Sequence, residues 1–253
     1  MSKKVCVVTG SSSGIGAATV RLYAKNGWNV VINFSRQLEP AEVVAAECRA
    51  LGAEVLVVQA DIASDADCRR LAAETEAKFG RADVLVNNAG TTKFVALKDL
   101  EGLSAEDFHA IYDVNVIGTY QMTRAFAPLM KKTPGGGVVN VSSVASMMGR
   151  GSSIAYMASK GAVNAMTVGL ARALAPEIRV NAIAPGFVET PWLEKGLGTA
   201  YGHQKAAYEN VAALGAVIQP EDVADAAWWL GAGAPKTTGE VLLLDAGLRI
   251  SKG

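Results

Sequence analysis

The sequence has few of the residues that bind metal ions or form disulfides. Its histidines and cysteines stand at none of the spacings typical of metal ligands; they are His109, His203, Cys6, Cys48 and Cys68. An odd cysteine count also argues against a disulfide framework and is typical of proteins from reducing compartments. We therefore expect no metal site and a cytoplasmic location.

An excess of one charge sign is also missing. Lys plus Arg and Asp plus Glu number 24 each in 253 residues, and no basic run stands out. The apolar run near the N-terminus, "VCVV", is too short for a signal peptide or a bilayer span. We expect neither a nucleic acid nor a membrane as partner.

Short apolar runs and helix-length stretches alternate along the chain. Three of the helix-length stretches are closed by Gly27, Gly52 and Gly80. Continuous apolar strands need cover on both faces, and helix-length crossovers make neighbouring strands parallel. We predict an α/β fold, a single doubly wound, Rossmann-type domain over 1–253, in which helices flank a parallel sheet of about seven strands. The expected strands are "KVCVV", "NVVIN", "EVLVVQ", "DVLVNN", "GVVNVSS", "IRVNAIA" and "EVLLLD".

A glycine-rich turn, "TGSSSGIG", follows the first expected strand and precedes a helix. Glycines let a backbone approach a pyrophosphate closely, and the following helix offers free N–H groups. The spacing differs from the general dinucleotide fingerprint, so a flexible Gly/Ser turn is the alternative. The expected phosphate contacts come from the turn itself, with hydroxyl and amide donors from its serines: Gly10, Ser11, Ser12, Ser13, Gly14, Ile15 and Gly16.

The stretch "SSIAYMASKGA" places a phenol and an ammonium group one helical turn apart. Tyr156 and Lys160 are four residues apart, so they share a helix face. A free tyrosine has a pKa of about 10, and a neighbouring cation favours the phenolate. We expect Lys160 to lower the pKa of Tyr156 toward neutrality.

These motifs, together with "NNAG" at 87–90 and "PG" at 185–186, resemble the short-chain dehydrogenase/reductase family, the subgroup of enzymes of about 250 residues. The resemblance covers nearly the whole chain and is greatest to 3-oxoacyl-carrier-protein reductases and related sugar and alcohol dehydrogenases. It implies an NAD(P)-dependent enzyme that interconverts C=O and CH–OH groups.

The resemblance also implies four catalytic residues. Tyr156 would exchange the proton with the substrate oxygen, and Lys160 would also bind the nicotinamide ribose. Ser143 would orient the carbonyl, and Asn115 would hold a water that links Lys160 to solvent. The alternatives are a hydroxyl that ends a strand for Ser143 and a helix Asn bonded to a nearby loop for Asn115.

The end of the second expected strand bears on the choice of cofactor. Phe34 stands where NAD-preferring sites usually place a carboxylate. Arg36 suits a 2′-phosphate and Ser35 adds a hydroxyl, which favours NADP(H) over NAD(H), although a solvated Arg is the ordinary alternative. The resemblance adds further cofactor contacts at Asp61, Ile62, Asn88, Ala89, Gly90, Pro185, Gly186, Val188 and Thr190.

The substrate end follows the sixth expected strand. The segment 187–219 runs on without a clear helix, and such long insertions are usually functional. The resemblance implies that it covers the substrate. Phe187 and Trp192 suggest an apolar lining, whereas Met147 and Met148 serve equally well as filler.

The resulting prediction is an NADPH-dependent reductase that converts a ketone reversibly into a secondary alcohol. One alternative is an NAD-dependent dehydrogenase of a sugar, steroid or cyclic alcohol. Another is a catalytically silent NAD(P)-binding regulator, against which the intact set of Ser143, Tyr156, Lys160 and Asn115 speaks. A homotetramer is expected on the resemblance.

Overall fold

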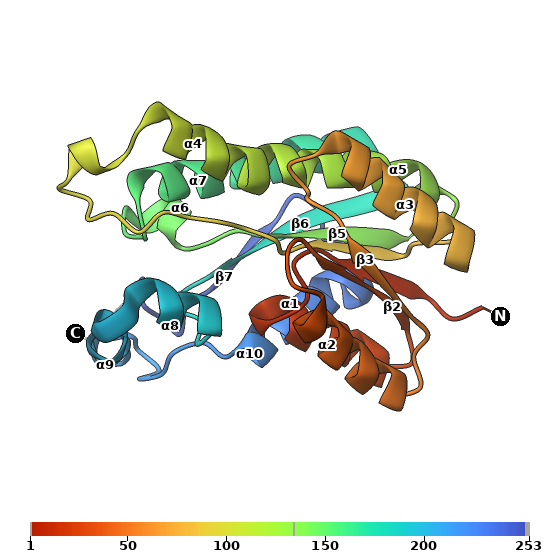
Figure 1. Ribbon diagram of the computed structural model, residues 1–253, viewed down its shortest axis with the longest axis horizontal. Coiled ribbons are helices and arrows are strands. Elements are labelled where there is room, and N and C mark those ends of the chain that lie inside the picture. The colour runs from red at the N-terminus through yellow and green to blue at the C-terminus, as the bar shows by residue number, and fades with distance from the viewer. Residues whose placement is uncertain (1, 134, 251–253) are drawn as a thin grey trace.

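A computed structural model describes residues 2–133 and 135–250. Its centre is a sheet of seven parallel strands in the order β3-β2-β1-β4-β5-β6-β7, which confirms the predicted fold class (Figure 1). The strand order reverses between β1 and β4, and ligands bind at such a point in doubly wound sheets. The strands are β1 (Val5–Val8), β2 (Asn29–Phe34), β3 (Val55–Gln59), β4 (Val84–Asn87), β5 (Gly136–Val141), β6 (Ile178–Pro185) and β7 (Val241–Leu244).

Helices cover both faces of the sheet, as the continuous apolar strands required (Figure 1). One face carries α1 (Gly14–Lys25), α2 (Leu38–Ala50) and α10 (Pro220–Trp228). The other carries α3 (Asp65–Phe79), α4 (Ala105–Tyr112), α5 (Thr119–Lys131) and α7 (Ile154–Leu174). Three further helices stand near the carboxyl ends of the strands: α6 (Ala145–Met148), α8 (Pro191–Leu197) and α9 (Tyr201–Val211).

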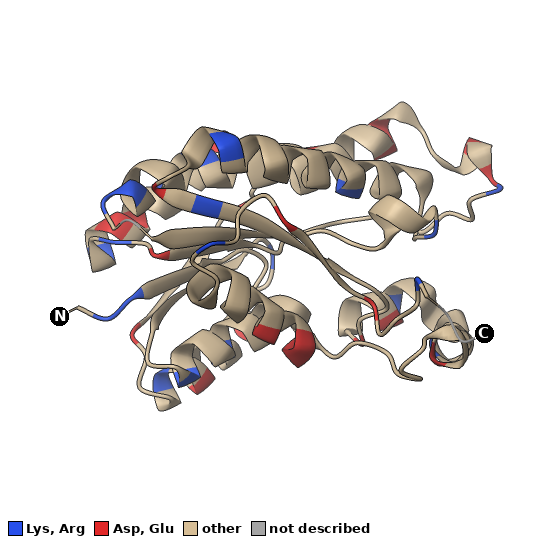
Figure 2. Cartoon of the chain, turned by 180° about the vertical axis from the view of Figure 1, so that it is seen from behind, with Lys and Arg blue, Asp and Glu red and all other residues tan. Residues whose placement is uncertain are grey.

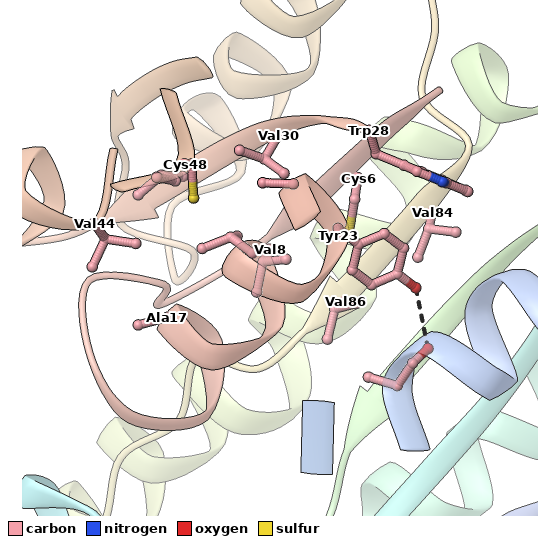
Figure 3. Packing of buried hydrophobic residues seen from close by; sticks show 14 of the residues in the cluster. Cys6, Val8, Ala17, Tyr23, Trp28, Val30, Val44, Cys48, Val84 and Val86 are labelled. Carbon is pink, nitrogen blue, oxygen red and sulfur yellow. Dashed lines mark hydrogen bonds between the residues drawn. The ribbon is translucent and has the colours of Figure 1, made fainter. Parts of the chain in front are cut away.

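Alternate side chains of each strand enter one of two hydrophobic cores. On β1, Cys6 and Val8 face the core under α1 and α10, whereas Val5 and Val7 face the opposite core. Figure 3 shows Tyr23 at the centre of the first core, where its hydroxyl donates a hydrogen bond of 3.1 Å to the Ala227 carbonyl. The fully buried strands therefore hold the sheet rigid beneath its carboxyl edge.

A buried polar ladder crosses the second core. Asn87 on β4 donates to Thr123 on α5 at 3.1 Å and to Asn140 on β5 at 2.9 Å. Asn140 in turn donates to Thr167 on α7 at 2.9 Å. The ladder ties two strands to two helices directly below the predicted site, and sequence reasoning did not identify it.

The segment 187–219 differs from the extended insertion that we expected. It contains α8 and α9, joined by a short 3-10 turn at Gly198–Ala200. Thr190 caps α8 by accepting a hydrogen bond of 3.3 Å from the Leu193 amide. The apolar spacing of these short helices is weak, which explains why the sequence pattern did not reveal them.

Phe187 precedes these two helices. Its ring packs against Tyr201 and Tyr208 of α9, with centroids 5.6 and 5.7 Å away, so it anchors α9. Its place in an apolar substrate lining stays a prediction. Glu189 strengthens this anchor through an ion pair of 2.7 Å with Lys205.

Charges of both signs are scattered over the outer helices, and the strands carry few (Figure 2). Within residues 2–133 and 135–250, no helix is both long and apolar enough to cross a membrane. The same residues contain no group of three or more His, Cys, Asp or Glu side chains arranged to hold a metal ion.

Candidate active site

The glycine-rich turn after β1 packs closely against the loop after β4. Gly10 and Gly14 have φ of +61° and +52°, in the left-handed region that favours glycine. A Cβ atom on Gly10 would lie 2.9 Å from the Ala89 Cα, and one on Gly16 would lie 2.5 Å from the Gly10 carbonyl oxygen. The turn therefore requires glycines at these positions. This favours the interpretation as an ordered phosphate-binding turn over that of a flexible Gly/Ser turn.

The three serines of the turn have different positions. The Ser11 hydroxyl is buried, donates to the Val8 carbonyl at 2.8 Å and accepts from the Asn33 amide at 3.0 Å. Its single proton is therefore used inside the protein, and our expectation of a hydroxyl donor for a ligand is wrong at Ser11. Ser12 is half-buried and Ser13 exposed. Ser13 makes no side-chain cap with α1, so the first N–H groups of that helix remain available to an anion.

Two residues that sequence reasoning missed hold the turn in place. The Thr9 hydroxyl accepts hydrogen bonds of 3.0 Å from the amides of Asn88 and Ala89. The Asn33 side-chain oxygen accepts one of 3.1 Å from the Gly10 amide. A buried asparagine near the end of an apolar strand was the available signal, because such a group needs partners.

The carboxyl ends of β2 and β3 lie side by side and carry the expected adenosine contacts. Phe34 is buried, whereas Ser35, Arg36 and Asp61 are exposed. Asp61 is held by the Ala63 amide, which donates to its carboxylate at 3.0 Å. Within the described residues Arg36 has no ion pair or side-chain hydrogen bond, so its guanidinium is available. Ile62 is buried, and its carbonyl accepts from Gln121 at 3.3 Å.

Tyr156 and Lys160 share a face of α7, as their spacing predicts. The Lys160 Nζ lies 5.6 Å from the centroid of the Tyr156 ring. It donates to the Val141 carbonyl at 2.7 Å, and its side chain is nearly completely buried. A Cβ atom on Gly90 would lie 3.6 Å from the same Nζ, so the loop after β4 passes over the ammonium group. Two N–H groups of Lys160 remain for a ligand.

The direction of the Tyr156 pKa differs from our expectation. Burial raises the pKa of Tyr156 to about 12, and a hydrogen bond with Ser143 opposes this shift only in part. Burial also lowers the pKa of Lys160 to about 8. Desolvation outweighs the effect of the cation because the Nζ does not contact the phenol oxygen. At neutral pH the chain by itself therefore presents a protonated phenol beside an ammonium group.

Ser143 and Asn115 border the same pair. Ser143 follows β5, and its hydroxyl accepts from the Ala145 amide at 3.2 Å. Asn115 lies in a π-helical turn, Asp113–Gly118, between α4 and α5. Its side chain exchanges two hydrogen bonds with the Thr91 backbone, at 2.8 and 3.0 Å, and donates to Ser159 at 3.0 Å. These contacts match the alternative given for Asn115 in the sequence analysis, in which a helix asparagine is hydrogen-bonded to a nearby loop.

The expected contacts after β6 lie opposite the glycine-rich turn. A Cβ atom on Gly14 would lie 3.3 Å from the Thr190 Cγ2, so this turn touches the start of α8. Val188 forms a parallel bridge with Ile218. Pro185 is buried at the end of β6, and a Cβ atom on Gly186 would overlap the Tyr208 hydroxyl.

The chain therefore has the parts of a dinucleotide site. A turn with glycines where the backbone is tightly packed, free N–H groups on α1, the available Arg36 and the spare N–H groups of Lys160 all lie along the carboxyl edge of the sheet. The residues present fit a dinucleotide with a nicotinamide end beside Tyr156.

Comparisons with known proteins agree with this geometry. The family model for short chain dehydrogenases matches residues 4–199. The chain is 41% identical, over 97% of its length and 96% of the relative's, to a Streptomyces violaceoruber protein assigned as ketoacyl reductase 2 of the granaticin polyketide synthase. It is 35% identical to L-fucose dehydrogenase of Mus musculus, over 100% and 90% of the two chains.

A crystal structure of a Burkholderia xenovorans protein classed as a short-chain dehydrogenase/reductase superposes with a TM-score of 0.92 at 43% identity, over 99% of each chain. The chain belongs to the short-chain dehydrogenase/reductase family. It is an oxidoreductase that acts on a carbonyl or alcohol group with NAD(P).

Proposed function

We propose that the protein reduces a ketone to a secondary alcohol with NADPH, reversibly, and that Tyr156 is its general acid and base. The observation that carries the proposal is the grouping of three side chains: the Tyr156 phenol is hydrogen-bonded with Ser143, and the buried Lys160 holds its Nζ 5.6 Å from the centroid of the Tyr156 ring. A phenol held in its neutral form can donate a proton to a carbonyl oxygen as that oxygen gains charge.

The side chains around the phenol have distinct tasks. Ser143 donates to the carbonyl oxygen and orients it toward Tyr156. Lys160 binds ribose hydroxyls through its two remaining N–H groups, and its charge stabilises the phenolate that forms after proton transfer. The nicotinamide, when bound, supplies the hydride. The Ser143 hydroxyl and the Tyr156 phenol then face the same oxygen atom.

Asn115 takes part, under this proposal, by fixing the loop over Lys160. Its hydrogen bonds to Thr91 hold the loop after β4 next to Gly90, where an added Cβ atom would lie 3.6 Å from the Lys160 Nζ. The π-helical turn at Asp113–Gly118 departs from the regular helical hydrogen-bond pattern, and such turns are frequent at functional sites. A water bound there would connect Lys160 with solvent.

Tyr156→Phe tests the mechanism. Removal of the phenol oxygen should lower kcat for ketone reduction by about 10²–10⁴-fold, the usual contribution of a general acid. The Kd for NADPH, measured by fluorescence titration, should stay within about threefold, because the ring itself remains. A variant that retains more than about a tenth of the wild-type kcat would exclude Tyr156 as the acid.

The preference for NADP(H) is supported by the exposed, available guanidinium of Arg36 beside the buried Phe34. Arg36→Ala should lower kcat/KM with NADPH by about 10–100-fold, because a charged hydrogen bond contributes about 1.5–3 kcal/mol. The value with NADH should hardly change. Arg49, an exposed arginine on α2 paired with Glu42, offers a control through Arg49→Ala.

An unchanged NADPH value in Arg36→Ala would instead favour the second candidate, an NAD-dependent sugar or cyclic-alcohol dehydrogenase. The similarity to L-fucose dehydrogenase supports that candidate.

Three wider assignments are also proposals. The chain forms one domain over 1–253, supported by the single continuous sheet. It resides in a reducing cytoplasm, supported by three free, buried cysteines. It forms a homotetramer, supported by apolar side chains exposed along the helices near Asn115: Ile117, Tyr120 and Val168. Sedimentation equilibrium measures the last of these.

A further inference from the structure

The rings of Trp192 and Phe94 lie beside the Tyr156 phenol. Trp192, on α8, has its ring centroid 6.4 Å from that of Tyr156 and 5.7 Å from that of Phe94. Phe94 belongs to the loop after β4 and is half-buried, whereas Trp192 is 45% exposed. An indole at this distance can contact the group attached to a carbonyl carbon whose oxygen faces Tyr156.

The two rings are held from opposite sides. The Val95 amide donates to the Ser152 carbonyl at 2.8 Å and fixes the loop that carries Phe94. On α8, Gly196 lies directly over the Phe94 ring, since a Cβ atom there would come within 2.1 Å of the Phe94 Cε2. The absence of a side chain at Gly196 therefore allows α8 to rest on Phe94 and place Trp192 near the phenol.

The polar groups beside Phe94 are already paired. The Thr92 hydroxyl lies 2.7 Å from that of Ser152. Lys93 forms an ion pair of 2.7 Å with Asp107. A substrate rich in hydroxyl groups would find few free partners here, and a buried polar group without a partner is costly.

We propose that Phe94 and Trp192 form an aromatic wall that selects ketones with an aromatic ring attached to the carbonyl carbon. Offset or edge contacts between aromatic rings add to the burial of apolar area, so an aryl group gains more from this wall than a short alkyl group. The inference rests on the proposed function, because it takes Tyr156 as the group that faces the carbonyl oxygen.

The first test compares kcat/KM for acetophenone and for butanone, both with NADPH. Trp192→Ala should lower the value for acetophenone by about tenfold or more and leave that for butanone within about threefold. The control is Trp229→Ala, which removes a tryptophan of similar exposure, 47%, outside the site. It should change neither value.

The second test moves the wall without removing a ring. Gly196→Ala forces α8 or the Phe94 ring to shift and should lower the acetophenone-to-butanone ratio of kcat/KM in the same direction as Trp192→Ala. Gly202→Ala is the matched control, because a Cβ atom at this α9 position meets nothing within 4 Å. Its ratio should equal that of the wild type.

The outcomes separate this inference from the function on which it rests. A wild type that reduces butanone, with an acetophenone-to-butanone ratio unchanged in both Trp192→Ala and Gly196→Ala, would overturn the aromatic wall and leave the reductase intact. Oxidation of L-fucose in preference to 1-phenylethanol would overturn the substrate class. A wild type that reduces no ketone with either cofactor would overturn both proposals.

Discussion

The buried charge of Lys160 lowers the stability of the folded protein. Its side chain is 4% exposed and has one hydrogen bond within the protein, to the Val141 carbonyl. Burial lowers its pKa to about 8, so the folded protein binds the proton less tightly than the unfolded chain does. The ammonium group therefore destabilises the fold at neutral pH, a cost that the proposed role of Lys160 in binding and proton transfer would explain.

We expect Lys160→Met to abolish reduction and to raise the free energy of unfolding at pH 7 by about 2 kcal/mol, once the lost hydrogen bond is subtracted. The sign follows from the lowered pKa: wild-type stability rises as pH increases from about 8 toward 10.5, where the unfolded lysine releases its proton. The difference in the free energy of unfolding between Lys160→Met and the wild type should therefore decrease from about pH 8 to pH 10.5. Urea unfolding at pH 7 and pH 9.5 measures the free energy of unfolding of the wild type and of the variant. A difference between the two proteins that grows with pH would contradict the lowered pKa of Lys160.

At the scale of elements, the buried ladder of Asn87, Asn140, Thr123 and Thr167 fixes the helices against the sheet. A ladder of this kind loses much stability when one member is removed, and here the buried side-chain oxygen of Asn87 already has no hydrogen-bond partner among the described residues. Since α7 also carries Tyr156, the proposed acid, the hydrogen bond from Asn140 to Thr167 ties the helix of that residue to β5.

Asn140→Ala should destabilise the protein by about 2–3 kcal/mol, because it leaves Asn87 with one fewer partner in a closed core and creates a cavity. Differential scanning calorimetry should show a Tm lower by roughly 5–10 °C. Asn26→Ala is the control: the side chain of this exposed asparagine also donates one hydrogen bond, to the Leu22 backbone carbonyl at 2.8 Å. An equal decrease of Tm in Asn140→Ala and Asn26→Ala would show that the ladder has no special role in stability.

Elements also differ in how well the sequence predicts them. The apolar run at Val84–Asn87 is a strand in any context that covers both faces, so local pattern suffices. The helices α8 and α9 have no strong apolar stripe; they are stabilised by Glu189 and by the rings around Phe187. Such contacts join side chains of the preceding loop to α9, so the apolar spacing within either helix does not reveal them.

At the scale of the whole molecule, the doubly wound sheet was predictable and much of the site's support was not. The motif "NNAG" could be assigned to the cofactor edge, but the hydrogen bonds from Asn88 and Ala89 to Thr9 depend on β1 and β4 being neighbours. The direction of the Tyr156 pKa likewise depends on how much water the complete fold removes. Both properties arise only when distant segments meet.

The strand order has a consequence for how the protein is made. Residues up to about Gly90 already contain the glycine-rich turn, Asn33 and the β4 loop that pack together. Tyr156, the proposed proton donor, and α8 come from the part of the chain after β5. Domains fold as units, and the core on one face of β1 and β4 is closed by α5 and α7. The glycine-rich turn therefore becomes fixed only together with the later segment that carries the proposed acid.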